Sequence, residues 1–259
     1  MINNIKAWFI KRNPIFTSHL QRIGLLRIIP PALAMYIMIP VYIFFHIVCI
    51  KLLYNLLICP LLSVERIELK HYIVIDRHLL PGLSYTAKFH CAYCGYANGL
   101  SVATSVLLTR ISTEARLPAN NILRVLLIFA YFITSGLSVL AQSLVILSFD
   151  YVMAPLLGLH RMSMQQATDK MKASGFAGEF TVFGKLGRQL LRFEYNCSLR
   201  HANSLEQIES QWCPIKHLDD YPGAVYPEHH EFFIERCELC KLRRVLCSEG
   251  TVSTRKPTW

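Results

Sequence analysis

Charge is scarce in this sequence. Asp, Glu, Lys and Arg make up only 17% of its 259 residues, whereas hydrophobic residues make up 53%. Ordinary soluble domains are about one quarter charged, so this composition argues against a freely soluble domain and favours a chain that contacts a membrane.

Several signatures of enzymes and secreted proteins are also missing. The chain has no C-x-x-C-H haem attachment, no G-x-G-x-x-G motif and no glycine loop spaced to hold phosphate. Its nine cysteines are too few and too irregular for a disulfide scaffold. No convincing signal peptide is present, because the first apolar run begins only at Ile28 and no small-residue cleavage site follows it. A chain without a signal peptide is expected to stay in a reducing compartment, where C-x-x-C pairs indicate metal binding or redox chemistry instead of disulfides.

Acidic residues are absent from the N-terminal segment. Residues 1–27 hold five Lys and Arg side chains and no Asp or Glu, in a chain of net charge +10. Basic residues beside apolar segments commonly face anionic lipid headgroups. No basic stripe interleaved with aromatic residues is present, so we expect the lipid bilayer, and no nucleic acid, as a partner. We predict a location in the cell inner membrane, with the polar part of the chain facing the cytoplasm.

Two long apolar blocks are the main positive feature. Because about 20 apolar residues cross a bilayer as a helix, we predict membrane blocks at residues 28–62 and 125–159. Each block could be one long tilted helix or a broken hairpin. Prolines that could kink or break the first block are Pro30, Pro31, Pro40 and Pro60.

The rest of the sequence is more polar. We expect a basic N-terminal segment at residues 1–27, a polar module in two parts at residues 63–124 and 160–247, and a disordered tail at residues 248–259. In the module, HYIVI at 71–75 resembles a strand, and residues 187–212 have helical composition. The predicted fold class is a mainly α membrane protein, with two long apolar helical blocks and a small zinc-ribbon-like or α+β module.

The stretch CAYCGY, residues 91–96, is typical of half a metal site. Two residues between Cys91 and Cys94 allow both thiolates to face one ion from a tight turn. Gly95 directly after the second cysteine relieves the steric strain of such a turn. A tetrahedral ion needs two further ligands, so the chain must supply another half.

The best second half is QWCPIKH, residues 211–217. Cys213 and His217 are three residues apart, and Pro214 stiffens the turn between them. The predicted ligand set is three thiolates and one imidazole: Cys91, Cys94, Cys213 and His217. Zinc is the expected ion, with iron as the alternative, because thiolates and imidazole bind both.

Other ligand sources stay open. Cys237 and Cys240 form another C-x-x-C pair that could complete an all-thiolate site or a second site. His90 stands next to Cys91, and His229-His230 could also contribute. The remaining interpretation is that the cysteines are plain thiols.

The two blocks CAYCGYANGL and QWCPIKH resemble the paired blocks of an uncharacterised family of bacterial membrane proteins. The first is also similar to a rubredoxin or zinc-ribbon knuckle. The resemblance covers residues 76–100 and about 206–235, and it implies a metal-binding membrane protein without implying a reaction. This sequence departs from the family by a long insertion between the blocks, which contains the second apolar block.

The spacing of the two halves constrains the topology. Between Cys94 and Cys213 lie 118 residues, including the second apolar block. If that block crossed the membrane once, the two halves would face opposite sides and could not share an ion. A shared site therefore predicts a hairpin or a shallow in-plane element, with the bend placed at Thr134-Ser135-Gly136.

These features lead to three functional hypotheses. The leading one is a membrane-associated scaffold or interaction protein with a structural zinc ion, which could contact another membrane protein. The alternative is a rubredoxin-like, membrane-tethered electron carrier. An enzyme that uses the metal as a Lewis acid is less favoured, because four protein ligands leave no open coordination position.

Overall fold

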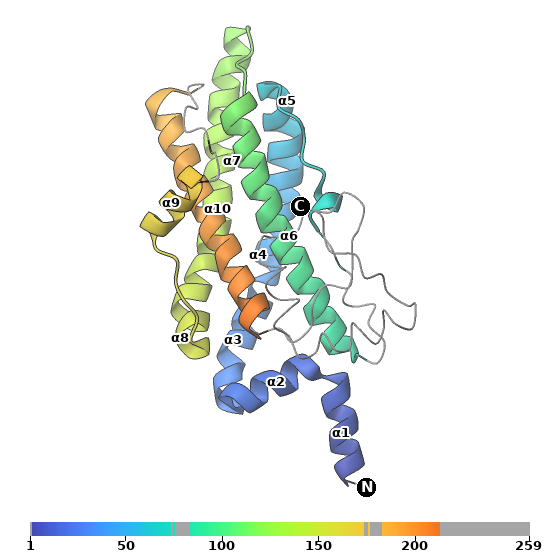
Figure 1. Ribbon diagram of the computed structural model, residues 1–259. Helices are drawn as coiled ribbons and strands as arrows, with labels where there is room; N and C mark the ends of the chain where they lie inside the picture. The colour runs from blue at the N-terminus through green and yellow to red at the C-terminus, as the bar shows by residue number, and fades with distance from the viewer. Residues whose placement is uncertain (1, 74, 76–82, 174–175, 177–182, 213–259) are drawn as a thin grey trace. The chain divides into compact units, whose positions relative to one another are not determined.

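The computed structural model describes residues 2–73, 75, 83–173, 176 and 183–212, and this part of the chain is almost wholly helical (Figure 1). The prediction of a mainly α fold is confirmed. The strand expected at 71–75 does not occur in the described part of that stretch, where His71 ends a short 3-10 helix, η2 (Leu69–His71). No zinc-ribbon-like or α+β module occurs among the described residues, since none of them is in a strand.

The chain divides into two compact units, and each is described by itself. Unit 1 comprises Met1–Pro30, Leu69–Gly99 and Leu205–Trp259, and unit 2 comprises Pro31–Glu68 and Leu100–Ser204. Two long helices, α6 (Tyr85–Glu114) and α10 (Gly184–Trp212), contribute residues to both units. The helix expected at 187–212 is therefore confirmed as α10.

In unit 1, two short helices are tied to the start of α6. They are α1 (Ile2–Arg12) and α2 (Pro14–Ile23). Ser84 Oγ accepts the N–H of Ala87 at 3.2 Å, which caps α6, and the Ser84 N–H donates to the carbonyl of Arg12 at 2.8 Å. The Ser84 hydroxyl also donates to Oδ1 of Asn13 at 2.5 Å. One serine thus fixes both the first turn of α6 and the junction between α1 and α2.

Further along α6, Gly99 allows another segment of unit 1 to pass close by. A Cβ atom at Gly99 would overlap the carbonyl oxygen of Tyr72 and lie 2.7 Å from Cα of Ile73. Only a residue without a side chain permits this approach of one backbone to another.

The first apolar block forms one helical stretch, Leu25–Leu62. Its successive segments are α3 (Leu25–Ile37), α4 (Ile39–Phe44), the π-helix η1 (Phe45–Ile58) and α5 (Cys59–Leu62). The second block forms α7 (Asn121–Ser148), the π-helix η4 (Phe149–Met153) and α8 (Ala154–Leu157). Pro40 and Pro60 stand near the starts of α4 and α5, whereas Pro30 and Pro31 lie within α3. The block therefore continues in one direction past all four prolines.

A proline follows the π-helical stretch in both blocks. The N–H of Cys59 donates to the carbonyl of Tyr54, and the N–H of Ala154 donates to that of Phe149, five residues earlier in each case. The next residue is a proline in both. A proline ring collides with the carbonyl four residues before it in an α-helix, and the wider π turn relieves that collision.

The bend expected at Thr134-Ser135-Gly136 is absent, because α7 continues through these residues as one helix of 28 residues. The side chain of Asn120 caps the helix by accepting the N–H groups of Ile122 and Leu123. The polar residues at 134 and 135 are fully buried and face the interior of unit 2. They are core residues of a continuous helix, not turn residues.

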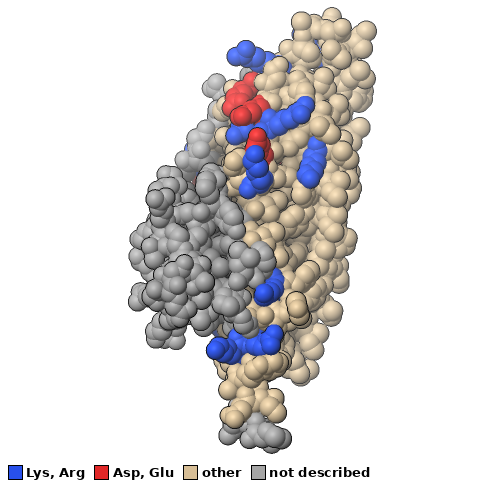
Figure 2. All heavy atoms as spheres, turned by 90° about the vertical axis from the view of Figure 1, so that its right-hand side faces the viewer, with Lys and Arg blue, Asp and Glu red and all other residues tan. Residues whose placement is uncertain are grey.

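Two described helical stretches, Leu25–Leu62 and Asn121–Leu157, are long and apolar enough to cross a membrane. Only 22% and 28% of their most apolar windows are buried inside the chain, whereas the core helix of a soluble protein would be mostly buried. Exposed apolar side chains on the second stretch include Ile122, Val125, Leu126, Phe129, Ile133 and Leu140. On the face shown in Figure 2, acidic and basic residues gather in small groups and leave broad areas uncharged.

In unit 2, α7 packs against η1 and α4, and α10 runs beside α7 and η4 in the same direction. The direction follows from two contacts: Ser135 meets Glu194, and Asp150 meets Arg200 further along both helices. Residues 158–183, which include α9 (Met164–Ala173), therefore carry the chain back to the start of α10.

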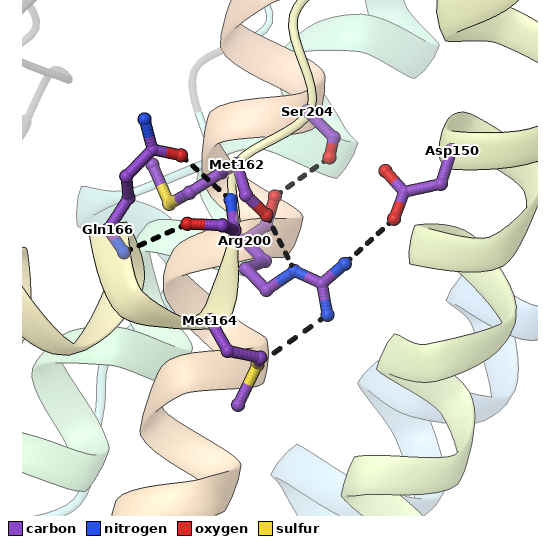
Figure 3. A network of polar contacts seen from close by, with 7 residues as sticks. Asp150, Met162, Met164, Gln166, Arg200 and Ser204 are labelled. Carbon is purple, nitrogen blue, oxygen red and sulfur yellow. Dashed lines mark hydrogen bonds and ion pairs between the residues drawn. The ribbon is translucent and has the colours of Figure 1, made fainter.

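A polar network fixes this return segment to α10 (Figure 3). Arg200 forms an ion pair with Asp150 at 2.7 Å and donates to the carbonyl of Met162 at 3.1 Å. Ser163 and Gln166 form a reciprocal capping box at the start of α9, with N–H to side-chain distances of 2.8 and 3.2 Å. One arginine thus holds α10, η4 and the segment before α9 together.

Candidate functional site

The predicted cysteine pair lies on α6 in unit 1. Cys91 is buried and Cys94 is half-buried, and both stand within a continuous α-helix instead of the expected tight turn. Ala87, Cys91 and Gly95 recur every four residues on a buried side of this helix. Gly95 is therefore a helix packing position, and the turn predicted from it is wrong.

The other predicted metal ligands cannot be compared with the structure. Cys213, His217, Cys237 and Cys240 all lie outside the described residues. His90, the remaining alternate ligand, lies on α6 beside Cys91, and burial lowers its pKa. Within the described ranges, no group of three or more His, Cys, Asp or Glu side chains is arranged to hold a metal.

A second group of chemically capable residues lies in the core of unit 2. Its centre is Glu194 of α10, whose side chain is fully buried. The hydroxyl of Tyr54 lies 2.7 Å from each carboxylate oxygen, and Ser135 Oγ donates to Oε2 at 2.6 Å. Ser138 also hydrogen-bonds to this carboxyl group. Three hydroxyl groups from two other helices thus surround one buried acid.

His201 is the second ionisable residue on the same side of α10. It is fully buried, and its Nε2 lies 2.9 Å from the Tyr42 hydroxyl. Its Nδ1 is buried and has no hydrogen-bond partner among the described residues. Phe45 packs against the ring edge, with 6.3 Å between ring centroids.

Between these two residues the core stays polar. Ser198 Oγ lies 2.8 Å from Ser105 Oγ of α6, and Gln142 of α7 donates to Ser138 at 3.2 Å. We call the whole set the polar column; its members are Tyr42, Tyr54, Ser105, Ser135, Ser138, Gln142, Glu194, Ser198 and His201. All of them belong to unit 2, and α4, η1, α6, α7 and α10 each contribute.

Burial shifts the two ionisable groups in opposite directions. It raises the pKa of Glu194 to about 7, although the hydrogen bonds from the surrounding hydroxyls oppose that rise. It lowers the pKa of His201 to about 3, so the imidazole is neutral at neutral pH. Near pH 7, Glu194 can therefore exist with or without its proton.

The sequence interpretation missed this group. The available signal is the spacing on residues 187–212: Glu194, Ser198 and His201 are four and three residues apart, which places them on one helix face. The spacing identifies a functional group only if this face is known to be buried. The sequence does not show that, because Arg192 and Arg200 make residues 187–212 resemble an ordinary amphipathic helix.

No family model, curated protein or solved structure matches this chain. The resemblance of the two cysteine blocks to a family of bacterial membrane proteins therefore stays a prediction.

Proposed function

We propose that this chain is a membrane-associated scaffold or interaction protein, in which Cys91, Cys94, Cys213 and His217 bind one structural zinc ion. The observation that carries the proposal is the composition of unit 1. This unit contains the cysteine half of α6 and also the end of α10, Leu205–Trp212. Cys213 follows directly after the last residue of α10. Along the chain, the second ligand block therefore directly follows a segment of the unit that holds the first ligand block.

The helical setting of the cysteine pair is compatible with metal binding. Residues three apart on an α-helix lie on one face, separated by a rise of about 4.5 Å. Metal sites in helix bundles take ligand pairs from helices at this spacing. Asn98 Nδ2 donates to Cys94 Sγ at 3.5 Å, the kind of hydrogen bond that orients a thiolate ligand.

Membrane association is supported by the two long apolar helices and by their exposed apolar side chains. The cytoplasmic orientation is supported by α1 and α2, which carry Lys6, Lys11, Arg12 and Arg22 and no acidic residue just before the first apolar helix. Basic residues next to a first membrane helix favour the cytoplasmic side. Zinc would stabilise the fold by joining segments far apart in sequence.

The same ligand set defines the second candidate, a membrane-tethered electron carrier with iron in place of zinc. The absorption spectrum of the purified protein separates the two, because ferric thiolate absorbs visible light and zinc thiolate does not. A metal enzyme is the least favoured, since four protein ligands would leave no open position for substrate.

Metal analysis of purified variants tests the proposal. We expect about one metal ion per chain in the wild type, and loss of that ion in Cys94→Ser and Cys213→Ser. Cys59→Ala is the matched control, because Cys59 is buried in unit 2 and should not affect metal content. Full metal stoichiometry in Cys213→Ser would overturn the ligand set, and Cys237→Ser then tests the alternate pair.

A further inference from the structure

The polar column has the composition of a proton relay. On α10, Glu194, Ser198 and His201 place a carboxyl, a hydroxyl and an imidazole on one buried face. Seven residues of α-helix separate the first from the last, a rise of about 10 Å. Each of these groups can both donate and accept a hydrogen bond in at least one protonation state.

Glu194 has no cationic partner within the described residues. The titratable groups near it are Tyr54 and Cys49 of η1, Tyr131 of α7 and Cys197 of α10. All four are weak acids, and none of them is a cation. A buried carboxylate without a counter-ion is disfavoured, which favours the protonated form of Glu194.

Two buried atoms of the column have no hydrogen-bond partner in the part of the chain that the structure describes. They are Nδ1 of His201 and Oε1 of Gln142, and both residues are fully buried. Buried polar atoms of this kind usually bind an internal water molecule. Internal water beside these atoms would connect the hydroxyl groups around Glu194 with the imidazole.

The helix α7, which borders the column, has an apolar outer face. On α7, Ser135, Ser138 and Gln142 are buried, whereas Ile133 and Leu140 are exposed. An ionisable group buried beside a helix whose outer surface suits lipid is a typical site of proton transfer.

We propose that the polar column conducts protons through unit 2, between the carboxyl of Glu194 and the Tyr42–His201 pair. Glu194 gives its proton to a neighbouring hydroxyl or water, whose own proton moves to the next acceptor, and the carboxylate then takes up another proton. His201 binds a proton at one ring nitrogen and releases one from the other. Only O–H and N–H bonds form and break, and no electron is transferred.

This inference rests on the membrane association proposed above and is independent of the metal site. The test uses the purified full-length protein in phospholipid vesicles with a pH-sensitive dye inside. A potassium gradient with valinomycin drives proton entry. Flotation of the vesicles and metal content are measured on the same samples, so failure of the proposed function is detected separately.

We expect wild-type vesicles to acidify faster than vesicles without protein, and Glu194→Gln to slow this by about tenfold or more. Glu65→Gln is the matched control, because the Glu65 side chain is 77% exposed in its pair with Arg110. Wild-type vesicles that float but acidify no faster than protein-free vesicles would overturn the proposal. Equal rates in the wild type and Glu194→Gln would overturn it too.

Two milder variants decide the question if Glu194→Gln does not fold. Ser198→Ala removes the hydroxyl between the two ionisable residues and is expected to slow proton entry severalfold. Tyr54→Phe removes a donor to the carboxylate, which raises the pKa of Glu194 and moves the pH profile of proton entry to higher pH. Unchanged rate and pH profile in both variants would contradict the proposal.

Discussion

Glu194 and His201 are buried in the same core, and each makes the stability of the fold depend on pH. The pKa of Glu194 rises from its ordinary value of 4.5 to about 7, so its contribution is present below pH 4.5 and is lost as pH rises through 7. The pKa of His201 falls from 6.5 to about 3, so its contribution is present above pH 6.5 and is lost as pH falls through 3. Between pH 4.5 and 6.5 the two contributions oppose each other.

Two variants should therefore show opposite changes in pH dependence. Between pH 4.5 and 6.5, the free energy of unfolding of Glu194→Gln rises with pH relative to the wild type, whereas that of His201→Phe falls. Each difference approaches about 1 kcal/mol per pH unit. Thermal unfolding followed by circular dichroism across this range measures both. The same sign of change in the two variants would contradict opposite pKa shifts for the buried groups.

At the scale of helices, the contact of Gly99 with the backbone of Tyr72 can be tested directly. Gly99→Ala forces a Cβ atom into the carbonyl of Tyr72, and we expect a loss of about 1–3 kcal/mol in the free energy of unfolding. Gly136→Ala on α7 is the matched control, because no heavy atom lies within 4 Å of its added Cβ. Alanine favours helix there, so this variant gains up to about 1 kcal/mol. Equal stability of the two variants would argue against the close approach.

The ion pair between Arg200 and Asp150 connects α10 to η4. Its side chains are only 21% and 14% exposed, so the removal of one partner leaves a poorly solvated charge. We expect Arg200→Met to lower the free energy of unfolding by about 3 kcal/mol, and the double variant with Asp150→Asn to recover part of it. Additive effects of the two substitutions in denaturant unfolding would show that the pair is not coupled.

The long elements could be predicted from the sequence, because their signal is local. Uninterrupted apolar runs predicted both long helices to within a few residues, and helical composition predicted α10. The turn at CAYCGY could not be distinguished from a helix, because Gly95 suits either a tight turn or close helix packing. The packing around Ala87 and Cys91 decides between them, and it depends on residues distant in sequence.

At the scale of the whole molecule, the return of the chain lies elsewhere than the sequence predicted. The bend expected in α7 is absent, and residues 158–183 bring the chain back to the start of α10 in unit 2. This segment has no long uninterrupted apolar run, so hydropathy gives no sign of it. The polar column depends on the same arrangement, since α10 inserts Glu194 beside α7 only after the return.

The return segment also changes the topological argument about the metal site. From Cys94 the chain follows α6 to the start of α7 and returns along α7; residues 158–183 then carry it back, and α10 runs in the same direction as α7. These two passes in each direction leave Cys94 and the end of α10 on one side, even if α7 crosses the membrane. We therefore expect both cysteines on the same side of the membrane. Cys94 and Cys213 can share one ion only if they lie on the same side, and this arrangement needs no hairpin within α7.

Thiol labelling of Cys94 and Cys213 in sealed membrane vesicles of both orientations tests this central claim most directly. A membrane-impermeant maleimide is applied with and without a chelator, and the labelled residues are identified by mass spectrometry of peptides. We predict that both cysteines are protected in the native protein and that both react from the same side once the chelator removes the metal. Reaction of Cys94 and Cys213 from opposite sides would contradict the account.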